Sequence, residues 1–357
     1  MRDILVKNKV SLKTIDLFCG CGAVSLGLKR KGFKIVAGVD NNPIACKTYR
    51  KNHPRVVLLE KDIKKVDPRK IRNKLLKGKD IDLLVVCSPC QPFSSLNQKS
   101  RGDIRQLLIH QACRFAKILK PKVIFFENVP GLAAFPKILT KLNSDLEAIG
   151  YVLSEPAKLN AADFGVPQRR FRCIMIAKRM KKIAKTKKIS FLLNPVTPKG
   201  KRVTVKKAIG NLPSLKSGEI DKSDKLHFAR NHQPIVLRRL THIPKNGGSR
   251  FSLPKFLELK CHRNHKGHPD VYGRMRWSSI APTLTTGCTD ITRGRFGHPE
   301  DNRAITLREA ARLQTFPDSY KFSGNAQEVA TQIGNAVPVK FVEIIASKLR
   351  NEITKRT

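Results

Sequence analysis

The chain has 357 residues, 40% of them hydrophobic, which is enough to bury a sizeable core and to form more than one domain. Lys and Arg total 71 against 27 Asp and Glu, a formal net charge of +44. No run of about 18 apolar residues exists, and the first ten residues are too charged for a signal peptide, so we expect neither a membrane span nor export. A chain this basic attracts polyanions, and we expect nucleic acid as its partner unless the charge merely decorates the surface.

The first half of the chain alternates short β-prone runs with helical patterns. Strands are predicted at residues 14–18, 34–39, 81–87 and 123–126, with a further one at 173–177. Helices are predicted between them at 24–31, 43–52 and 106–120. This alternation is typical of an α/β fold built on a doubly wound, mostly parallel sheet.

Composition changes after the last predicted strand. Residues 178–207 contain twelve Lys or Arg and no Asp or Glu, which indicates a domain boundary. Periodicity is weak and turns are frequent from about 191 to 325, whereas residues 327–350 are again partly helical. We therefore predict a larger domain made of 11–190 plus 326–357 and a smaller, irregular domain at 191–325.

A glycine-containing turn follows the first predicted strand. Ligands of an open parallel sheet bind beyond the carboxyl ends of its strands. Gly20 and Gly22 allow a tight turn there and a ligand close to the backbone, and Asp40 ends the next strand, where an acid can hydrogen-bond ribose hydroxyls. Ser25 stands where a dinucleotide fingerprint has its third glycine. The pattern indicates a nucleoside-containing cofactor, NAD included, or a purely structural turn.

The second candidate site is the segment Ser-Pro-Cys-Gln-Pro-Phe-Ser at residues 88–94, directly after the strand that ends at Cys87. Its two prolines stiffen the loop and would present Cys90 at a defined angle. A thiolate is a good nucleophile once its pKa is lowered. The alternatives are a buried packing cysteine and a redox pair with Cys87.

The third candidate is Glu127, at the end of the strand predicted at 123–126. A carboxyl in that position is partly desolvated, which favours its protonated form and would let it donate a proton near neutral pH. The alternatives are a helix-capping carboxylate and a salt bridge.

Three polar residues at alternate positions form the fourth candidate. Arg170 and Arg172 share one face if this segment is a strand, and together with Gln168 they could line one anionic site. The alternative is a solvated basic edge. By contrast, the cysteine and histidines at 261, 262, 265 and 268 lack a second ligand pair nearby, so we expect no bound metal.

Taken in order, these motifs resemble the cytosine-5 DNA methyltransferase family, most closely its bacterial modification enzymes, over nearly the whole chain. The matching segments are 16–22, Asp62-Ile63, Pro89-Cys90-Gln91, Asp103/Arg105/Leu108, 127–129, Gln168/Arg170/Arg172, 303–317 and 334–338. The resemblance implies a catalytic domain of the S-adenosylmethionine-dependent methyltransferase type at 11–190 plus 326–357. It also implies a target-recognition domain at 191–325.

The resemblance also implies the roles of individual residues. Cys90, Glu127 and Arg172 would be catalytic: the thiolate adds to C6 of cytosine, the carboxyl binds N3, and the guanidinium holds the base. S-Adenosylmethionine would be bound by Phe18, Gly20, Gly22, Asp40, Asn41, Asp62, Ile63, Pro89, Leu108, Asn335 and Val337. DNA would be contacted by Gln91, Ser94, Gln168, Arg170, Arg250, Arg274, Thr283 and Thr285.

The function implied is methylation of C5 of a flipped cytosine at a specific DNA sequence, as part of a restriction-modification system. An RNA (tRNA) cytosine-5 methyltransferase on the same catalytic domain, a non-catalytic DNA-binding protein and an NAD dehydrogenase are the alternatives. The expected partner is double-stranded DNA, with a cognate restriction endonuclease acting separately. We expect a monomer in the cytoplasm, associated with the nucleoid.

Overall fold

The computed structural model describes residues 11–89, 104–180, 189–259, 261 and 269–354. The chain forms two compact units. The first consists of Met1–Leu159, Phe171–Asn194 and Val342–Thr357, and the second consists of Asn160–Arg170 and Pro195–Phe341. Among the described helices, none is long and apolar enough to cross a membrane.

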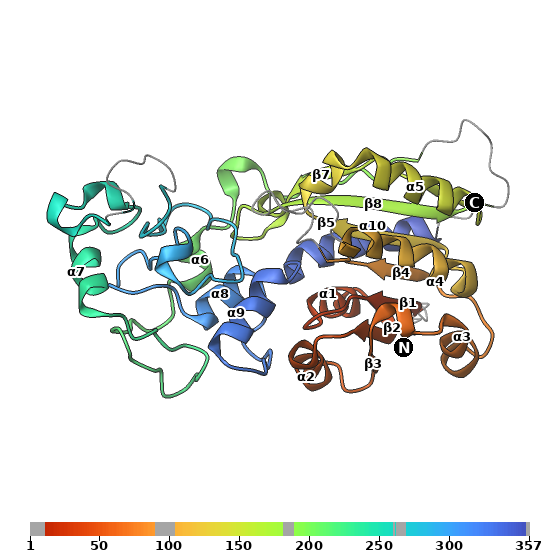
Figure 1. Cartoon of the computed structure of the whole chain (residues 1–357), viewed down its shortest axis with the longest axis horizontal. Coiled ribbons are helices and arrows are strands. Elements are labelled where there is room, and N and C mark those ends of the chain that lie inside the picture. The colour runs from red at the N-terminus through yellow and green to blue at the C-terminus, as the bar shows by residue number, and fades with distance from the viewer. Residues whose placement is uncertain (1–10, 90–103, 181–188, 260, 262–268, 355–357) are drawn as a thin grey trace, which may run out of the picture. The chain divides into compact units, whose positions relative to one another are not determined.

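The first unit is built on an eight-stranded sheet (Figure 1). Its strands are β1 (Leu12–Leu17), β2 (Phe33–Asp40), β3 (Val57–Glu60), β4 (Leu83–Val86), β5 (Val123–Asn128), β6 (Tyr151–Leu153), β7 (Ala157–Asn160) and β8 (Phe171–Arg179). The order is β3-β2-β1-β4-β5-β8-β6, and β7 pairs with β8. Strands β1 to β5 are parallel, while β8 runs antiparallel to β5 and to β6. The predicted mostly parallel α/β sheet is confirmed.

Helices connect the parallel strands of this sheet (Figure 1). They are α1 (Ala23–Arg30), α2 (Pro43–Asn52), α3 (Pro68–Leu76) and α4 (Gln111–Leu119). Helix α5 (Pro136–Glu147) leads from β5 to β6, and α10 (Val339–Thr354) follows the last strand. Helices α2 and α3 begin with proline after an Asn or Asp whose side chain accepts a backbone N–H, the usual helix-start signal. The helix predicted at 106–120 is divided into a 3-10 turn, Ile104–His110, and α4.

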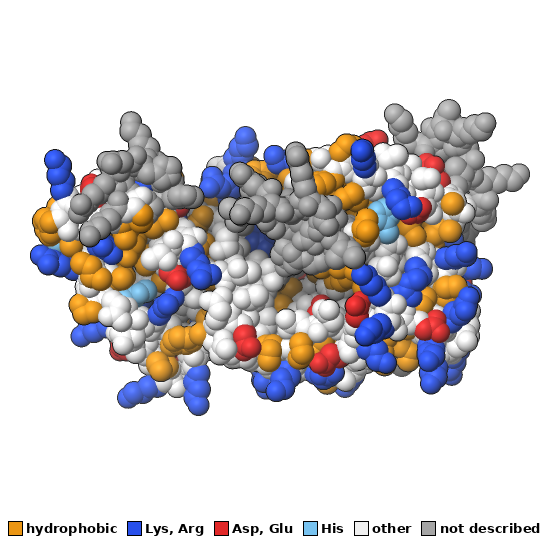
Figure 2. All heavy atoms as spheres, in the orientation of Figure 1, with side chains coloured by type: hydrophobic (Ala, Val, Ile, Leu, Met, Phe, Trp, Pro, Cys, Tyr) orange, Lys and Arg blue, Asp and Glu red, His pale blue; other side chains and the backbone are white. Residues whose placement is uncertain are grey.

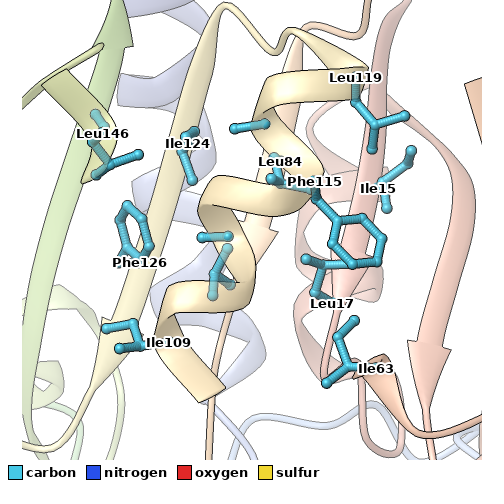
Figure 3. Close-up of a cluster of buried hydrophobic side chains, with 14 of the residues drawn as sticks. Ile15, Leu17, Ile63, Leu84, Ile109, Phe115, Leu119, Ile124, Phe126 and Leu146 are labelled. Carbon is cyan, nitrogen blue, oxygen red and sulfur yellow. The ribbon is translucent and has the colours of Figure 1, made fainter. Parts of the chain in front are cut away.

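The core of the first unit lies between the sheet and its helices. Phe115 and Leu119 of α4 face Ile15, Leu84 and Ile124 of three neighbouring strands (Figure 3). All four residues of β4 are buried, as expected for a parallel strand covered on both faces. Because β1, β2, β4 and β5 are parallel neighbours, this packing holds their carboxyl ends along one edge of the sheet.

The second unit is irregular, in agreement with its weak periodicity. It contains α6 (Val205–Ile209), α7 (Pro234–His242), α8 (Leu307–Leu313) and α9 (Ala326–Asn335), joined by turns and isolated β-bridges. Backbone carbonyls outside regular structure need other donors, and the buried Arg274 supplies them. Its guanidinium donates to the carbonyl oxygens of Leu240, Ile243 and His298 at 2.9, 3.2 and 3.0 Å. The prediction that Arg274 contacts DNA is corrected accordingly, since the side chain is only 1% exposed.

The units differ from the predicted domains at three places. Residues 191–194 group with the first unit, although the sequence assigned them to the smaller domain. Residues 160–170 and 326–341 group with the second unit, although the sequence assigned them to the larger domain. A side-chain carbon at Gly334 would lie 2.4 Å from the backbone of Thr285, so α9 packs closely against this other segment of the second unit. Periodicity identifies α9 as a helix but carries no information about the backbone against which it packs.

Candidate active site

The loop that follows β4 is fastened to the end of β5. Asn128 donates from Nδ2 to the carbonyl oxygen and to the hydroxyl of Ser88, both at 3.2 Å. Its Oδ1 accepts the backbone N–H of Val129 at 2.9 Å. Asn128 therefore fixes where this loop leaves the sheet. The predicted residues Cys90, Gln91 and Ser94 follow two or more residues later, outside the described part of the chain.

Glu127 and Arg172 form a buried ion pair across neighbouring strands. Arg172 Nε lies 2.7 Å from Glu127 Oε1, and the two side chains are 9% and 8% exposed. A second nitrogen of Arg172 donates to the carbonyl oxygen of Phe171 at 2.7 Å. The salt bridge that the sequence left open for Glu127 is thus present. The two charged groups predicted as catalytic lie together at the end of β5.

Cys87 is the other cysteine of the Cys-x-x-Cys pattern. Burial raises the pKa of its thiol well above the ordinary value, and the negative charge of Glu127 adds to the rise. A thiol held in its protonated form is a weak nucleophile. Cys87 is therefore unsuited to be the reactive cysteine.

The turn after β1 has the backbone geometry that a close ligand needs. Phe18, Gly20 and Gly22 adopt positive φ angles of 59°, 51° and 93°. The N–H of Gly20 donates to Asp40 Oδ2 at 2.8 Å, and the N–H of Asn42 donates to Asp40 Oδ1 at 2.9 Å. A side-chain carbon at Gly20 would meet no atom within 4 Å, so the backbone there faces open space. Carboxylate oxygens accept more than one hydrogen bond, which leaves Asp40 able to bind a hydroxyl.

The other predicted cofactor residues occupy varied positions. Asp62 caps the 3-10 turn Ile63–Lys65 by accepting the N–H of Lys64, and Ile63 is buried behind it. Asn41 is exposed, whereas Pro89 and Leu108 are partly exposed. Asn335 and Val337 belong to the second unit, the former exposed and the latter buried.

Comparison with known proteins identifies the family. Residues 12–351 match the sequence model of the C-5 cytosine-specific DNA methylase family. The chain belongs to this methylase family. It is 39% identical to the Type II methylase M.HgiDII of Herpetosiphon aurantiacus, over 94% of each chain. It is 34% identical to the Type II methyltransferase M1.HphI of Haemophilus parahaemolyticus, over 94% of this chain and 86% of that one.

A solved structure gives the same result for the fold. An Escherichia coli prophage-encoded protein, described as a DNA modification methyltransferase, superposes with a TM-score of 0.73 at 25% identity. The match covers 97% of this chain and 100% of the other. The protein is a DNA cytosine-5 methyltransferase, an activity that requires DNA as substrate and a methyl donor.

Two of the residues predicted to contact DNA have a structural role in the methylase. Arg170 is 2% exposed and donates to the carbonyl oxygens of Leu284 and Gly334 at 2.9 and 2.6 Å. Gln168 is fully buried, and its Oε1 accepts the N–H of Leu284 at 3.0 Å. The prediction that Gln168, Arg170 and Arg172 line one anionic site is wrong, because Arg170 and Arg172 bind different partners.

The remaining predicted DNA residues divide by exposure. Arg250 is only 7% exposed, and its guanidinium lies over the ring of Phe251, so the methylase does not present it to solvent as predicted. Thr283 is exposed and Thr285 is partly exposed. Both threonines remain candidates for DNA contact.

A chain of buried polar groups under the glycine turn was missed by sequence reasoning. The Ser25 hydroxyl lies 2.7 Å from Asp16 Oδ2 and 2.8 Å from the Tyr49 hydroxyl. The ring of Tyr49 packs on that of His53, and His53 Nε2 lies 3.0 Å from the carbonyl oxygen of Gly22. Burial lowers the pKa of His53 to about 4, so a neutral imidazole donates to this carbonyl. The sequence signal that could have predicted this chain of polar groups was Asp16 itself, an acidic residue within a strand that is otherwise largely apolar.

Asp16 is expected to make the stability of the methylase pH-dependent. Burial raises the pKa of its carboxyl to about 7, and Oδ1 has no hydrogen-bond partner among the described residues. The folded state holds the proton on Asp16 more tightly than the unfolded state does, so the protonated carboxyl stabilises the fold. This contribution to the free energy of unfolding is full below about pH 4 and is lost as the pH rises to about 7. Asp16→Asn removes the titration. Urea unfolding at several pH values should show the wild type losing stability relative to this variant between pH 4 and 7, and a constant difference would contradict the assignment.

Proposed function

We propose that this methylase transfers the methyl group of S-adenosylmethionine to C5 of a cytosine that is flipped out of duplex DNA at a specific sequence. The observation that carries the proposal is the buried Glu127–Arg172 pair at the end of β5, beside the loop that Asn128 anchors after β4. Relatives such as M.HgiDII and M1.HphI are named Type II enzymes. We therefore also propose a modification role alongside a separate restriction endonuclease.

The proposed chemistry begins at Cys90. Carbon 5 of cytosine is a poor nucleophile, and addition of the Cys90 sulfur to C6 breaks the C5–C6 double bond and moves electron density to C5. As the sulfur adds, the Glu127 carboxyl donates its proton to N3, where the charge develops, and Arg172 holds the carboxyl group in position; the proton returns to Glu127 when the sulfur leaves. After methyl transfer a base removes the C5 proton, the double bond re-forms, and the thiolate of Cys90 leaves.

The donor site is proposed at the turn after β1. S-Adenosylmethionine supplies an electrophilic methyl group on a sulfonium. The open backbone at Gly20 would admit it closely, Asp40 would bind its ribose hydroxyls, and Asn41 and Asp62 would flank its adenine. The buried chain from Asp16 to His53 would keep this turn in shape, since it ends on the carbonyl of Gly22.

The second unit is proposed to recognise the target sequence. The target carbon cannot be reached in a stacked duplex, so the enzyme must extrude the base while it holds the flanking DNA. Lys and Arg side chains are spread over the face in Figure 2, which suits phosphate contacts along a duplex. Of the described residues predicted to contact DNA, Thr283 and Thr285 are accessible and remain candidates for base contacts.

Bisulfite sequencing of DNA from a host that expresses the chain tests the function. We expect cytosines protected at one short sequence and nowhere else. A parallel assay with the purified protein and labelled S-adenosylmethionine should transfer label to duplex DNA and not to tRNA. Label in tRNA alone would favour the RNA methyltransferase alternative and refute the proposal.

A further inference from the structure

Two phenylalanine side chains of the second unit are unusually exposed. Phe251 and Phe256 are 59% and 65% exposed, and they lie in the 3-10 turns Arg250–Ser252 and Lys255–Leu257. Leu253 and Leu257, in and beside the same turns, are 6% and 1% exposed. The chain therefore buries its leucines here and leaves its larger aromatic rings in solvent, which the packing of this unit alone does not explain.

The part of the chain beneath these rings is firmly packed. Leu253 and Leu257 belong to a buried cluster with Leu240, Ile243 and Tyr272. Arg239 of α7 donates to the carbonyl oxygen of Leu257 at 2.9 Å, which fixes the second turn. The two exposed rings are thus presented by a fixed backbone, and a partner that binds them does not have to order a loop first.

Each of the two rings has an arginine beside it. The guanidinium of Arg250 lies 4.5 Å from the ring centre of Phe251, and that of Arg238 lies 5.3 Å from the ring centre of Phe256. Arg238 and Lys255 are exposed. Residues 230–257 contain six Lys or Arg and no Asp or Glu. Hydrophobic and basic side chains are intermixed over the part of this unit that carries α7 (Figure 2).

We propose that this aromatic face, defined as Phe251, Phe256, Arg238 and Lys255, binds duplex DNA. Its rings make apolar contacts with base edges in a groove, and its two exposed cations contact phosphates. The positive charge indicates which partner binds this face. It attracts a polyanion, whereas it repels a second copy of this chain, which carries another +44 formal charge. The proposal deepens the proposed function, because it names residues through which the second unit would hold the substrate.

The test compares a double variant with a matched control. Phe251→Ala/Phe256→Ala removes both rings, and Ile220→Ala removes another exposed apolar side chain of the same unit, one that is 59% exposed. Fluorescence anisotropy of the full-length chain with a pool of random-sequence duplex DNA, at one fixed salt concentration, gives the affinity. We expect roughly tenfold weaker binding for the double variant and no change for the control. Both proteins should melt at the wild-type temperature, because exposed side chains contribute little to folding.

A charge variant provides a second, independent readout. Arg238→Gln should reduce the slope of log affinity against log salt by about one, as expected when one phosphate contact is lost. A folded double variant that binds DNA with wild-type affinity would overturn the proposal. So would sedimentation showing a wild-type dimer that the double variant loses while its DNA affinity is unchanged. The binding assay does not depend on methyl transfer, so a chain that failed to methylate DNA would refute the proposed function and leave this test intact.

Discussion

Replacing Cys90 with serine is expected to abolish methyl transfer to DNA. A serine hydroxyl is almost entirely protonated at neutral pH, so it cannot add to C6, and C5 then stays too electron-poor to accept a methyl group. We expect the rate to fall by roughly 10⁴-fold or more, as when other enzymes lose their nucleophile. The measurement is the initial rate of label transfer from S-adenosylmethionine to duplex DNA. DNA binding measured in parallel should be unchanged, which shows that the variant is folded.

The matched control for this variant is Cys87→Ser. Cys87 begins the same Cys-x-x-Cys pattern, and its buried thiol is held protonated by burial and by Glu127, so it should contribute no nucleophile. We expect Cys87→Ser to keep most of the activity. If Cys87→Ser were inactive and Cys90→Ser active, the nucleophile would have been assigned to the wrong residue.

Trapping the covalent step gives a readout that a purely structural role of Cys90 would not affect. In DNA containing 5-fluorocytosine the atom on C5 cannot leave as a proton, so the addition product cannot return to an aromatic ring. Wild-type protein with S-adenosylmethionine should therefore form a protein–DNA adduct that survives denaturation. Cys90→Ser should form none.

Most of the sheet could be predicted from the sequence, and the strands that were missed have weak patterns. Strand β4 and the first four residues of β5 are continuous apolar runs because both strands are buried on both faces. Strand β1 alternates Leu12, Ile15 and Leu17 with polar residues, yet it is almost entirely buried. Strand β3 lies at the sheet edge and is partly exposed, and β6 has three residues, so neither has a distinct pattern. Helix α3 was also omitted, although Asp67 followed by proline is a helix-start signal.

The active site shows what sequence patterns leave undetermined. Glu127 was predicted at a strand end and is there, but its contact with Arg172, 45 positions later, depends on the antiparallel pairing of β8 with β5. Local periodicity does not specify that register. Arg170 and Arg274 were interpreted as surface residues because arginine usually is. In an irregular unit many carbonyls lack helix or sheet partners, and a buried guanidinium can satisfy several of them at once.

Removing Glu309 is expected to destabilise the second unit strongly. Arg303 donates from both terminal nitrogens to the two carboxylate oxygens of Glu309, each at 2.9 Å, and both side chains are 1% exposed. Burial alone would raise the pKa of Glu309, but the hydrogen bonds and charge of Arg303 lower it below the ordinary value. Glu309 also completes the capping box that starts α8, accepting the N–H of Thr306 at 2.7 Å. Glu309→Ala would leave Asp301 as the one remaining acidic partner of Arg303 among the described residues and would remove half of the capping box, so we expect a loss of about 3–5 kcal/mol.

A nearby ion pair supplies the control for this experiment. Arg312, on the same helix, binds Asp318 at 2.6 Å, but the Asp318 side chain is 54% exposed. Solvent screens that pair, so Asp318→Ala should cost less than about 1 kcal/mol. Urea unfolding of both variants at pH 7 makes the comparison, and equal losses would show that burial does not govern the strength of these pairs. Because the pKa of Glu309 is lowered on folding, its contribution is present above the ordinary carboxyl range and is lost as the pH falls through the folded-state value. The difference in free energy of unfolding between the two variants should therefore become smaller in acid.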